Sequence, residues 1–298
     1  MHSVRAGDCD WHSTPKRSAL KNAMLHFIVQ RIPRKWLQFF GRLQFTLPIL
    51  KVPINWIGAR IAASEGIIKH GVGSGLRFCA QGGYPGYLLG TSNAEEQEVL
   101  KQNLREKGVF YDIGANIGFY ATIAAKLVGS EGKVFAFEPF AASAEACRRN
   151  AKLNNFTHVT VVDAAVAAKE GQMTLELGES SAVHRLTVGE NGRKVRVVTI
   201  DQWRTEERAP APDLVMIDVE GAELDVLHGM LETLKEARPT IMVEVHWRGD
   251  AFFDFFSEHL NRLGYQLTTY AGEAPPLGFV RYHALIRCDE RKVGYNLP

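Results

Sequence analysis

From residue 109 onward, short apolar segments that suit β-strands alternate with longer segments that suit α-helices, and this alternation constrains the fold most strongly. The expected strands are 109–113, 133–138, 159–162, 213–219 and 240–245, and the expected helices are 119–128, 141–153, 222–234 and 251–263. Strands at 265–270 and 282–287 close the chain, and a hairpin-like section at 173–177 and 195–200 interrupts the alternation. Strands linked by helices form right-handed crossovers. The sequence therefore predicts an α/β fold with a doubly wound, mostly parallel sheet.

A soft boundary lies near residue 90. The stretch 71–90 is rich in glycine and predicts loops or short strands. A helix at 94–106 follows, with Asn93 as its N-cap, and Gly108 ends that segment. We therefore predict an N-terminal extension of residues 1–90 and one domain of residues 91–298.

The charge distribution sets the start of the chain apart. Residues 11–64 contain nine Lys and Arg and no Asp or Glu, whereas residues 65–298 contain 25 basic and 31 acidic residues. This basic arm is also aromatic, but no apolar run in it reaches the roughly 18 residues of a spanning helix. Two interpretations stay open: an arm that lies on an anionic membrane surface, or a helical cap packed on the body with a solvated basic face.

The cysteine spacing and the charge of the body indicate which compartment and which partners to expect. The four cysteines are widely spaced and form no CxxC pair, which favours a reducing compartment. We expect a cytoplasmic protein, with the membrane surface as the alternative site for the arm. The acidic body carries no nucleic-acid-binding signature, so no nucleic-acid partner is expected. The oligomeric state cannot be read from the sequence.

A glycine loop between the first strand and its helix carries the chemistry. Its spacing, Gly114-x-x-x-Gly118, differs from the G-x-G-x-x-G loop that binds dinucleotides, and Asp112 precedes it by two residues. A carboxylate there would disfavour a pyrophosphate and favour a ligand that carries an ammonium and a sulfonium. Glu138, twenty residues after Gly118, is suited to bind ribose hydroxyls. S-adenosylmethionine is therefore favoured over NAD.

Three motifs together indicate a family more specifically than the glycine loop does alone. They are Tyr-Asp-Ile-Gly-Ala-Asn-Ile-Gly at 111–118, Phe-Ala-Phe-Glu-Pro at 135–139 and Asp-Val-Glu-Gly-Ala-Glu at 218–223. In order and spacing the chain resembles the FkbM family of S-adenosylmethionine-dependent methyltransferases over roughly residues 90–250. The resemblance implies the Rossmann-like, seven-stranded class I methyltransferase fold with its last strand antiparallel. It also implies O-methylation of a hydroxyl on a small-molecule, glycan, glycolipid or other lipid-linked acceptor, or on a secondary metabolite. An NAD-type oxidoreductase and a non-catalytic S-adenosylmethionine-binding protein are the alternatives.

The same resemblance implies a set of cofactor-binding residues. Asp112, Gly114, Ala115, Asn116 and Gly118 would line the methionine and ribose portion, Glu138 and Pro139 the ribose and adenine side, and Asp163 with Ala164 the adenine. A turn residue is the alternative role for Asp163.

A cluster of polar residues is expected beside the cofactor. Asp218 and Glu220 end the fourth strand, and Glu244 and His246 end the fifth, so fold and spacing place all four at one sheet edge near Asp112. We expect Asp218 or His246 to be the general base; His246 suits better, because a nearby sulfonium lowers a carboxylate's pKa. No metal ligand is assigned, although a divalent metal and a purely structural role stay open alternatives.

Three further features lie near the expected cluster in the sequence. Glu223 is expected to open the next helix, where an acid suits the helix dipole. The polar segment 178–194 is expected to be a mobile substrate loop. Trp247 and Arg248 follow the fifth strand and are candidates to stack on and clamp an acceptor, with surface packing as the equal alternative for the Trp.

Overall fold

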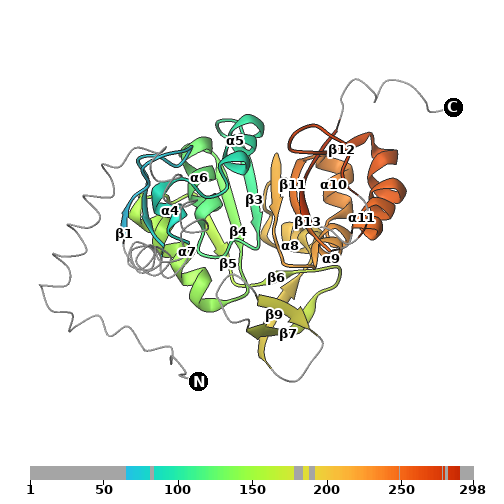
Figure 1. Ribbon diagram of the computed structural model, residues 1–298. Coiled ribbons are helices and arrows are strands. Elements are labelled where there is room, and N and C mark those ends of the chain that lie inside the picture. The colour runs from blue at the N-terminus through green and yellow to red at the C-terminus, as the bar shows by residue number, and fades with distance from the viewer. Residues whose placement is uncertain are drawn as a thin grey trace, which may run out of the picture.

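The computed structural model describes residues 65–80, 84–177, 184–187, 192–247, 249–276, 278 and 281–288. The basic arm, Arg248 and much of the expected loop at 178–194 lie outside these residues, so the expectations about them stay predictions. The described part forms a central sheet with helices packed around it, and a smaller sheet lies below it in Figure 1.

The central sheet has seven strands in the order β12-β13-β11-β10-β3-β4-β5. Only β13 runs antiparallel to its neighbours, which confirms the predicted mostly parallel sheet with one reversed strand. Its strands are β3 (Val109–Ile113), β4 (Lys133–Phe137), β5 (Val159–Val162), β10 (Leu214–Ile217), β11 (Thr240–His246), β12 (Tyr265–Thr269) and β13 (Arg281–Cys288). The strand order reverses beside β3, so the carboxyl ends of β3, β4 and β10 border a crevice where ligands bind in such sheets.

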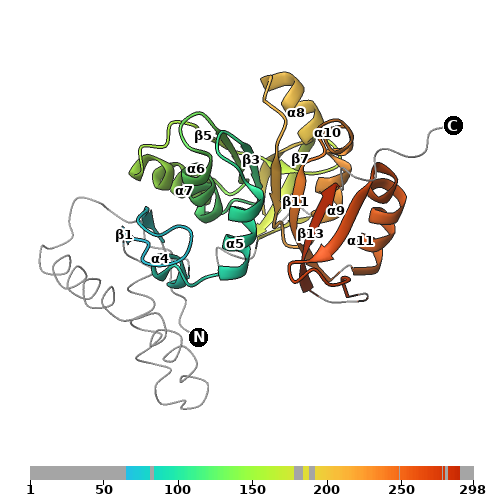
Figure 2. The same ribbon diagram turned by 90° about the horizontal axis from the view of Figure 1, so that it is seen from above.

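The sheet is covered on both faces because its buried strands are apolar on both sides. In β3, Phe110 belongs to one apolar cluster and Tyr111 and Ile113 to the other. The first cluster contains side chains of α4 (Gly86–Leu89), α5 (Ala94–Asn103), α6 (Phe119–Val128) and α7 (Ala141–Leu153). The second contains side chains of α8 (Ile200–Glu207), α9 (Glu223–His228), α10 (Leu231–Ala237), α11 (Gly249–Phe255) and the π-helix Phe256–Leu260, which the 3-10 turn Asn261–Leu263 follows. Seen from above, α4–α7 gather on one side and α9 and α11 on the other (Figure 2).

The glycine-rich segment packs on the sheet's helices. It contains a hairpin of β1 (Glu65–Ile67) and β2 (Arg77–Cys79), and Ile68 and Phe78 are fully buried in the first apolar cluster. The side chain of Asn150 on α7 accepts a hydrogen bond from the amide of Cys79 at 2.7 Å and donates to its carbonyl at 3.1 Å. Residues 65–80 are thereby fastened to α7, while the boundary near residue 90 stays a prediction.

The hairpin-like section forms a separate small sheet of four strands in the order β6-β9-β7-β8. The strands are β6 (Ala165–Val166), β7 (Gly171–Leu177), β8 (His184–Thr187) and β9 (Arg193–Val198), and β7 pairs with both β8 and β9. The expectation of a loop across 178–194 is therefore wrong for residues 184–187 and 193–194, which are strand.

Two helix expectations need correction. The helix expected at 222–234 is two helices, which Gly229 and Met230 separate. A Cβ at Gly229 would stand 2.2 Å from the carbonyl oxygen of Ala167, so only glycine fits at this position. The second helix starts where Asp201 accepts hydrogen bonds from the amides of Glu232 and Thr233. A helix at 200–207 was not expected at all.

Asn93 precedes α5 as expected but does not cap it. Its backbone has a φ of 47°, and its side chain donates to the Tyr120 hydroxyl at 2.8 Å. Within the described ranges, no helix has the length and apolar character needed to cross a membrane.

Candidate functional site

The glycine loop after β3 turns sharply against the neighbouring strands. Gly114 has a φ of +88°, and a Cβ at this position would stand 1.9 Å from the carbonyl oxygen of Asp218. The amides of Gly114 and Ala115 both donate to the carbonyl of Phe137, at 3.0 and 3.1 Å. Gly118 has a φ of +80° and lies against Cys147 of α7. Glycine is needed at both positions because the backbone conformation is left-handed and the space is taken.

This loop forms one wall of a cleft with about 940 Å³ of unfilled space, its open mouth included. Seven of the nine predicted cofactor residues line it: Asp112, Gly114, Ala115, Asn116, Glu138, Pro139 and Ala164. Gly118, at the end of the loop, packs against Cys147, and neither Gly118 nor Asp163 lines the cleft. The side chain of Asp163 is 53% exposed and pairs with Arg148, which agrees with the alternative of a surface role.

Glu138 follows β4 and lies at the base of the cleft, 7% exposed. One carboxylate oxygen accepts from the amide of Asn116 at 2.8 Å, and the other accepts from the amide of Phe140 at 2.7 Å. Burial raises the pKa of Glu138 to about 7, although both amide hydrogen bonds act to lower it. Each oxygen keeps a lone pair, so the carboxylate is held in place to accept from two ligand hydroxyls.

Asp112 lies in β3 beneath the loop and is 2% exposed. Burial raises its pKa to about 7, and its Oδ2 atom has no hydrogen-bond partner among the described residues. An unpaired buried carboxylate at the wall of a cleft favours a cationic ligand.

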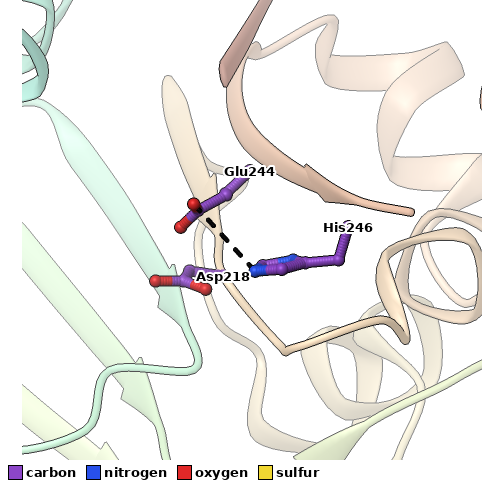
Figure 3. Close-up of side chains that lie close together, drawn as sticks. All are labelled: Asp218, Glu244 and His246. Carbon is purple, nitrogen blue, oxygen red and sulfur yellow. Dashed lines mark ion pairs between the residues drawn. The ribbon is translucent and has the colours of Figure 1, made fainter. Parts of the chain in front are cut away.

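The four predicted catalytic side chains converge at the carboxyl ends of β10 and β11. Asp218 follows β10, Glu244 and His246 belong to β11, and Figure 3 shows their side chains directed toward one another. One ligand atom from each lies within 4.8 Å of the others. Glu220, whose φ is 53°, brings a carboxylate oxygen to 3.5 Å from His246 Nε2. Asp218 and Glu220 also line the cleft, so the cluster forms one end of it.

His246 is oriented by Glu223. His246 Nδ1 lies 2.8 Å from Glu223 Oε1, which also accepts from the amide of Gly221. A carboxylate can only accept, so Nδ1 carries the proton. Burial acts to lower the pKa of His246, but the hydrogen bond to Glu223 and the charges of Glu220 and Glu244 outweigh it and raise that pKa. Glu223 thus holds the His as well as opening α9.

Glu244 belongs to a second set of contacts. Its Oε1 atom pairs with Arg281 and lies 3.4 Å from His283 Nε2, which in turn lies 2.9 Å from Glu96 Oε1. Burial acts to raise the pKa of Glu244, but these two cations hold it down to about 2. Glu244 therefore takes part in an ion pair with Arg281 as well as in the cluster.

Asp218 has no such partner. Burial and the charges of Glu244 and Glu220 raise its pKa to about 7, and its Oδ1 atom has no hydrogen-bond partner among the described residues.

Several contributors were not foreseen from the sequence. Tyr87 and Tyr120 line the cleft, and the Tyr120 hydroxyl donates to Glu96 at 3.0 Å. No spacing pattern in the sequence predicts these contacts, because Tyr87 belongs to α4, Glu96 to α5 and Tyr120 to α6. Glu223 had a signal, its place in the third motif. Trp247 is 40% exposed, and its stacking role stays a prediction.

Comparison with known proteins identifies the family. The profile of the methyltransferase FkbM domain matches residues 112–267. The chain is 28% identical over 156 residues to the hexuronic acid methyltransferase AglP of Haloferax volcanii, an alignment that covers 51% of this chain and 62% of that protein. It thus spans less than two thirds of that relative's length.

Two solved structures are similar at lower identity. Methyltransferase FkbM from Methylobacillus flagellatus is 19% identical, with a TM-score of 0.44 over 61% of this chain and 43% of that one. A putative methyltransferase from Streptococcus mutans in complex with SAH is 15% identical, with a TM-score of 0.39 over 64% and 93%.

Proposed function

Because this chain belongs to the FkbM methyltransferase family, we propose that it transfers the methyl group of S-adenosylmethionine to an oxygen of a saccharide. The family membership confirms the resemblance inferred from the three motifs. It also decides against the NAD-type oxidoreductase that the glycine loop alone left open.

The observation that carries the proposal is the pair of buried carboxyl groups in one cleft. Glu138 presents two oxygens held by backbone amides, which suits the two hydroxyls of a ribose. Asp112 Oδ2 lies unpaired at the cleft wall, which suits the cationic methionine portion of the ligand. Ala164 and Pro139 supply an apolar wall for the adenine. The predicted residues that line the cleft therefore fit S-adenosylmethionine.

The end of the cleft near Asp218 is where the acceptor belongs in this proposal. S-adenosylmethionine supplies an electrophilic methyl carbon, and the enzyme must align an acceptor oxygen with it and exclude water. Asp218, Glu220 and Glu244 present carboxylate oxygens there. Such a wall accepts hydrogen bonds from hydroxyl donors and repels an anion. We therefore propose a sugar hydroxyl as the acceptor; the relative's name, a hexuronic acid methyltransferase, supports a saccharide substrate.

A labelled transfer assay tests the acceptor class. The full chain is incubated with S-adenosylmethionine tritiated in the methyl group, with divalent cations present, and with matched oligosaccharides that end in a neutral hexose or in a hexuronic acid. Mild alkali then separates the products, because methyl esters hydrolyse while methyl ethers persist. Alkali-stable label in the saccharide is the expected result. Alkali-labile label would make a carboxylate the acceptor, and no label in either series would refute a saccharide substrate of this kind.

A matched pair of variants tests whether the reaction takes place in the cleft. Asp218→Asn removes a carboxylate at the acceptor end, and we expect transfer to fall at least 100-fold. Asp254→Asn changes an exposed carboxylate on α11 and leaves transfer unchanged. Equal activity of both variants would remove Asp218 from the acceptor site. Retained binding of S-adenosylhomocysteine without any transfer in the wild type would favour the non-catalytic binding protein.

A further inference from the structure

The cluster at the end of the cleft contains more carboxylates than its cations neutralise. Five carboxylates belong to it or to its direct contacts: Glu96, Asp218, Glu220, Glu223 and Glu244. The cations that face them are Arg281 and His283, both of which contact Oε1 of Glu244, and His246 when its ring is protonated. Buried charges of one sign are costly unless a counter-charge or a metal compensates them. The cluster thus retains an excess of negative charge beside Asp218.

A second observation is independent of the carboxylates. His246 is 1% exposed, and its Nε2 atom has no hydrogen-bond partner within the described part of the chain. This nitrogen faces the cluster, with Glu220 Oε2 at 3.5 Å and Glu244 Oε1 at 4.0 Å. Nδ1 donates to Glu223, so Nε2 is the nitrogen that offers a lone pair when the ring is neutral. This buried Nε2 atom, aimed at carboxylates, has no hydrogen-bond partner among the described residues.

The arrangement of Glu223 and His246 matches the way proteins orient metal ligands. A metal-bound His almost always donates its other ring N–H to a carboxylate or carbonyl, which fixes the tautomer and the ring orientation. Here Glu223 does this at 2.8 Å, and Glu223 is itself held by the amide of Gly221. The ring is therefore preset with Nε2 directed at Asp218 and Glu244 (Figure 3).

We propose that Asp218, Glu244 and His246 bind a divalent first-row metal ion, with Glu220 at its open side. One nitrogen and several carboxylate oxygens suit Mn²⁺ or Zn²⁺ better than Ca²⁺. The ligand atoms lie within 4.8 Å of one another, and binding draws them closer by about 1–2 Å to reach bond lengths near 2.1 Å. The metal replaces the missing partner of both His246 Nε2 and Asp218 Oδ1.

The use of this metal rests on the proposed function, whereas its binding does not. A sugar hydroxyl on the metal becomes more acidic, and its proton passes to the Glu220 carboxylate. The oxygen then forms the bond to the methyl carbon as the carbon–sulfur bond breaks, and that electron pair stays on sulfur. His246 is in this case a ligand, and the general-base role expected for it falls away.

Metal titration of the chelator-treated full chain, with any affinity tag removed, tests the site. Mn²⁺ binding is followed by the loss of the free-ion signal in electron paramagnetic resonance, and Zn²⁺ binding by calorimetry. We expect one ion per chain, with affinity reduced at least 100-fold in His246→Gln and Asp218→Asn. His259→Gln is the matched control: His259 also lies 4.0 Å from a glutamate, Glu258, but is 36% exposed, and this variant keeps wild-type affinity.

Glu223→Gln probes the positioning role. Loss of a carboxylate that orients a metal-bound His lowers metal affinity about 10–100-fold, and Glu223→Asp should restore part of it. Binding of S-adenosylhomocysteine at the other end of the cleft serves as the check that each variant is folded.

Two results would overturn the proposal. One is absence of stoichiometric binding of Mn²⁺ and Zn²⁺ in the wild type, and the other is binding that survives in both His246→Gln and Asp218→Asn. Methyl transfer that continues at full rate in excess chelator would point back to His246 as a base, with the proposed function intact. If the proposed function is wrong but the metal site is right, the chain binds the metal and no labelled saccharide forms.

Discussion

Gly114→Ala should damage both stability and ligand binding, and Gly75→Ala is its control. The two glycines have nearly the same φ, +88° and +89°, so the left-handed backbone costs an alanine at either position about 1–2 kcal/mol. Their surroundings differ, because a Cβ at Gly75 meets no atom within 4 Å, whereas one at Gly114 stands 1.9 Å from the Asp218 carbonyl oxygen.

The steric clash at Gly114 determines how much more stability Gly114→Ala loses than Gly75→Ala. Real Cβ atoms essentially never approach within 3.0 Å of another atom, so the loop or the end of β10 must move by about 1 Å, and overpacking of this kind costs about 1–3 kcal/mol. Gly114→Ala should therefore lose about 2–5 kcal/mol of unfolding free energy in urea titrations, and Gly75→Ala about 1–2 kcal/mol. Because Gly114 lines the cleft, its variant should also bind S-adenosylhomocysteine at least tenfold more weakly. Equal stabilities and affinities for the two variants would refute the close packing of this loop on Asp218.

Three further results are expected. Affinity for S-adenosylmethionine should fall at least tenfold from pH 8 to pH 6, because the Glu138 carboxyl, with a pKa of about 7, must be ionised to accept from the ribose, and Asp112 titrates in the same range. Glu138→Gln should bind weakly with a flatter calorimetric pH profile, and an equal slope would contradict this. Burial raises the pKa of Asp112 from 3.8 to about 7, so its contribution to stability is lost as pH rises between these values. Asp112→Asn should then raise the unfolding free energy at pH 8 relative to pH 5 by about 2–3 kcal/mol, since about two thirds of the interval between the two pKa values lies between these pH values, and no change in that difference would count against a buried carboxyl. We also propose that the basic arm at 11–64 binds anionic membranes; sedimentation with anionic vesicles should retain the full chain and not a chain that starts at residue 65, and equal retention would dismiss the arm's role.

Much of the fold was predictable because local signals and fold rules agree along the central strands. The strand at 109–113, the helix at 119–128 and the helix at 141–153 lie where the periodicity places them. The carboxyl ends of parallel strands share one edge, and this rule alone brought Asp218 and His246 together.

The rest depends on tertiary contacts or on weak local signals. Gly229, between α9 and α10, lies so close to Ala167 that only glycine fits there, and no local pattern shows this contact. The helix at 200–207 has a sequence signal in Thr199, three residues before Gln202, and in the structure the Thr199 hydroxyl accepts from the amide of Gln202. Glu223 was interpreted from the helix dipole alone, and its contact with His246 required the register of β11 against α9.

The central claim is that Glu138 and Asp112 form one end of an S-adenosylmethionine site. Its most direct test is calorimetric titration of the full chain at pH 8 with S-adenosylhomocysteine and, side by side, with NAD. We predict binding of one S-adenosylhomocysteine per chain, no binding of NAD, and loss of the signal in Glu138→Ala. Binding that is unchanged in Glu138→Ala, or a preference for NAD, would contradict the account.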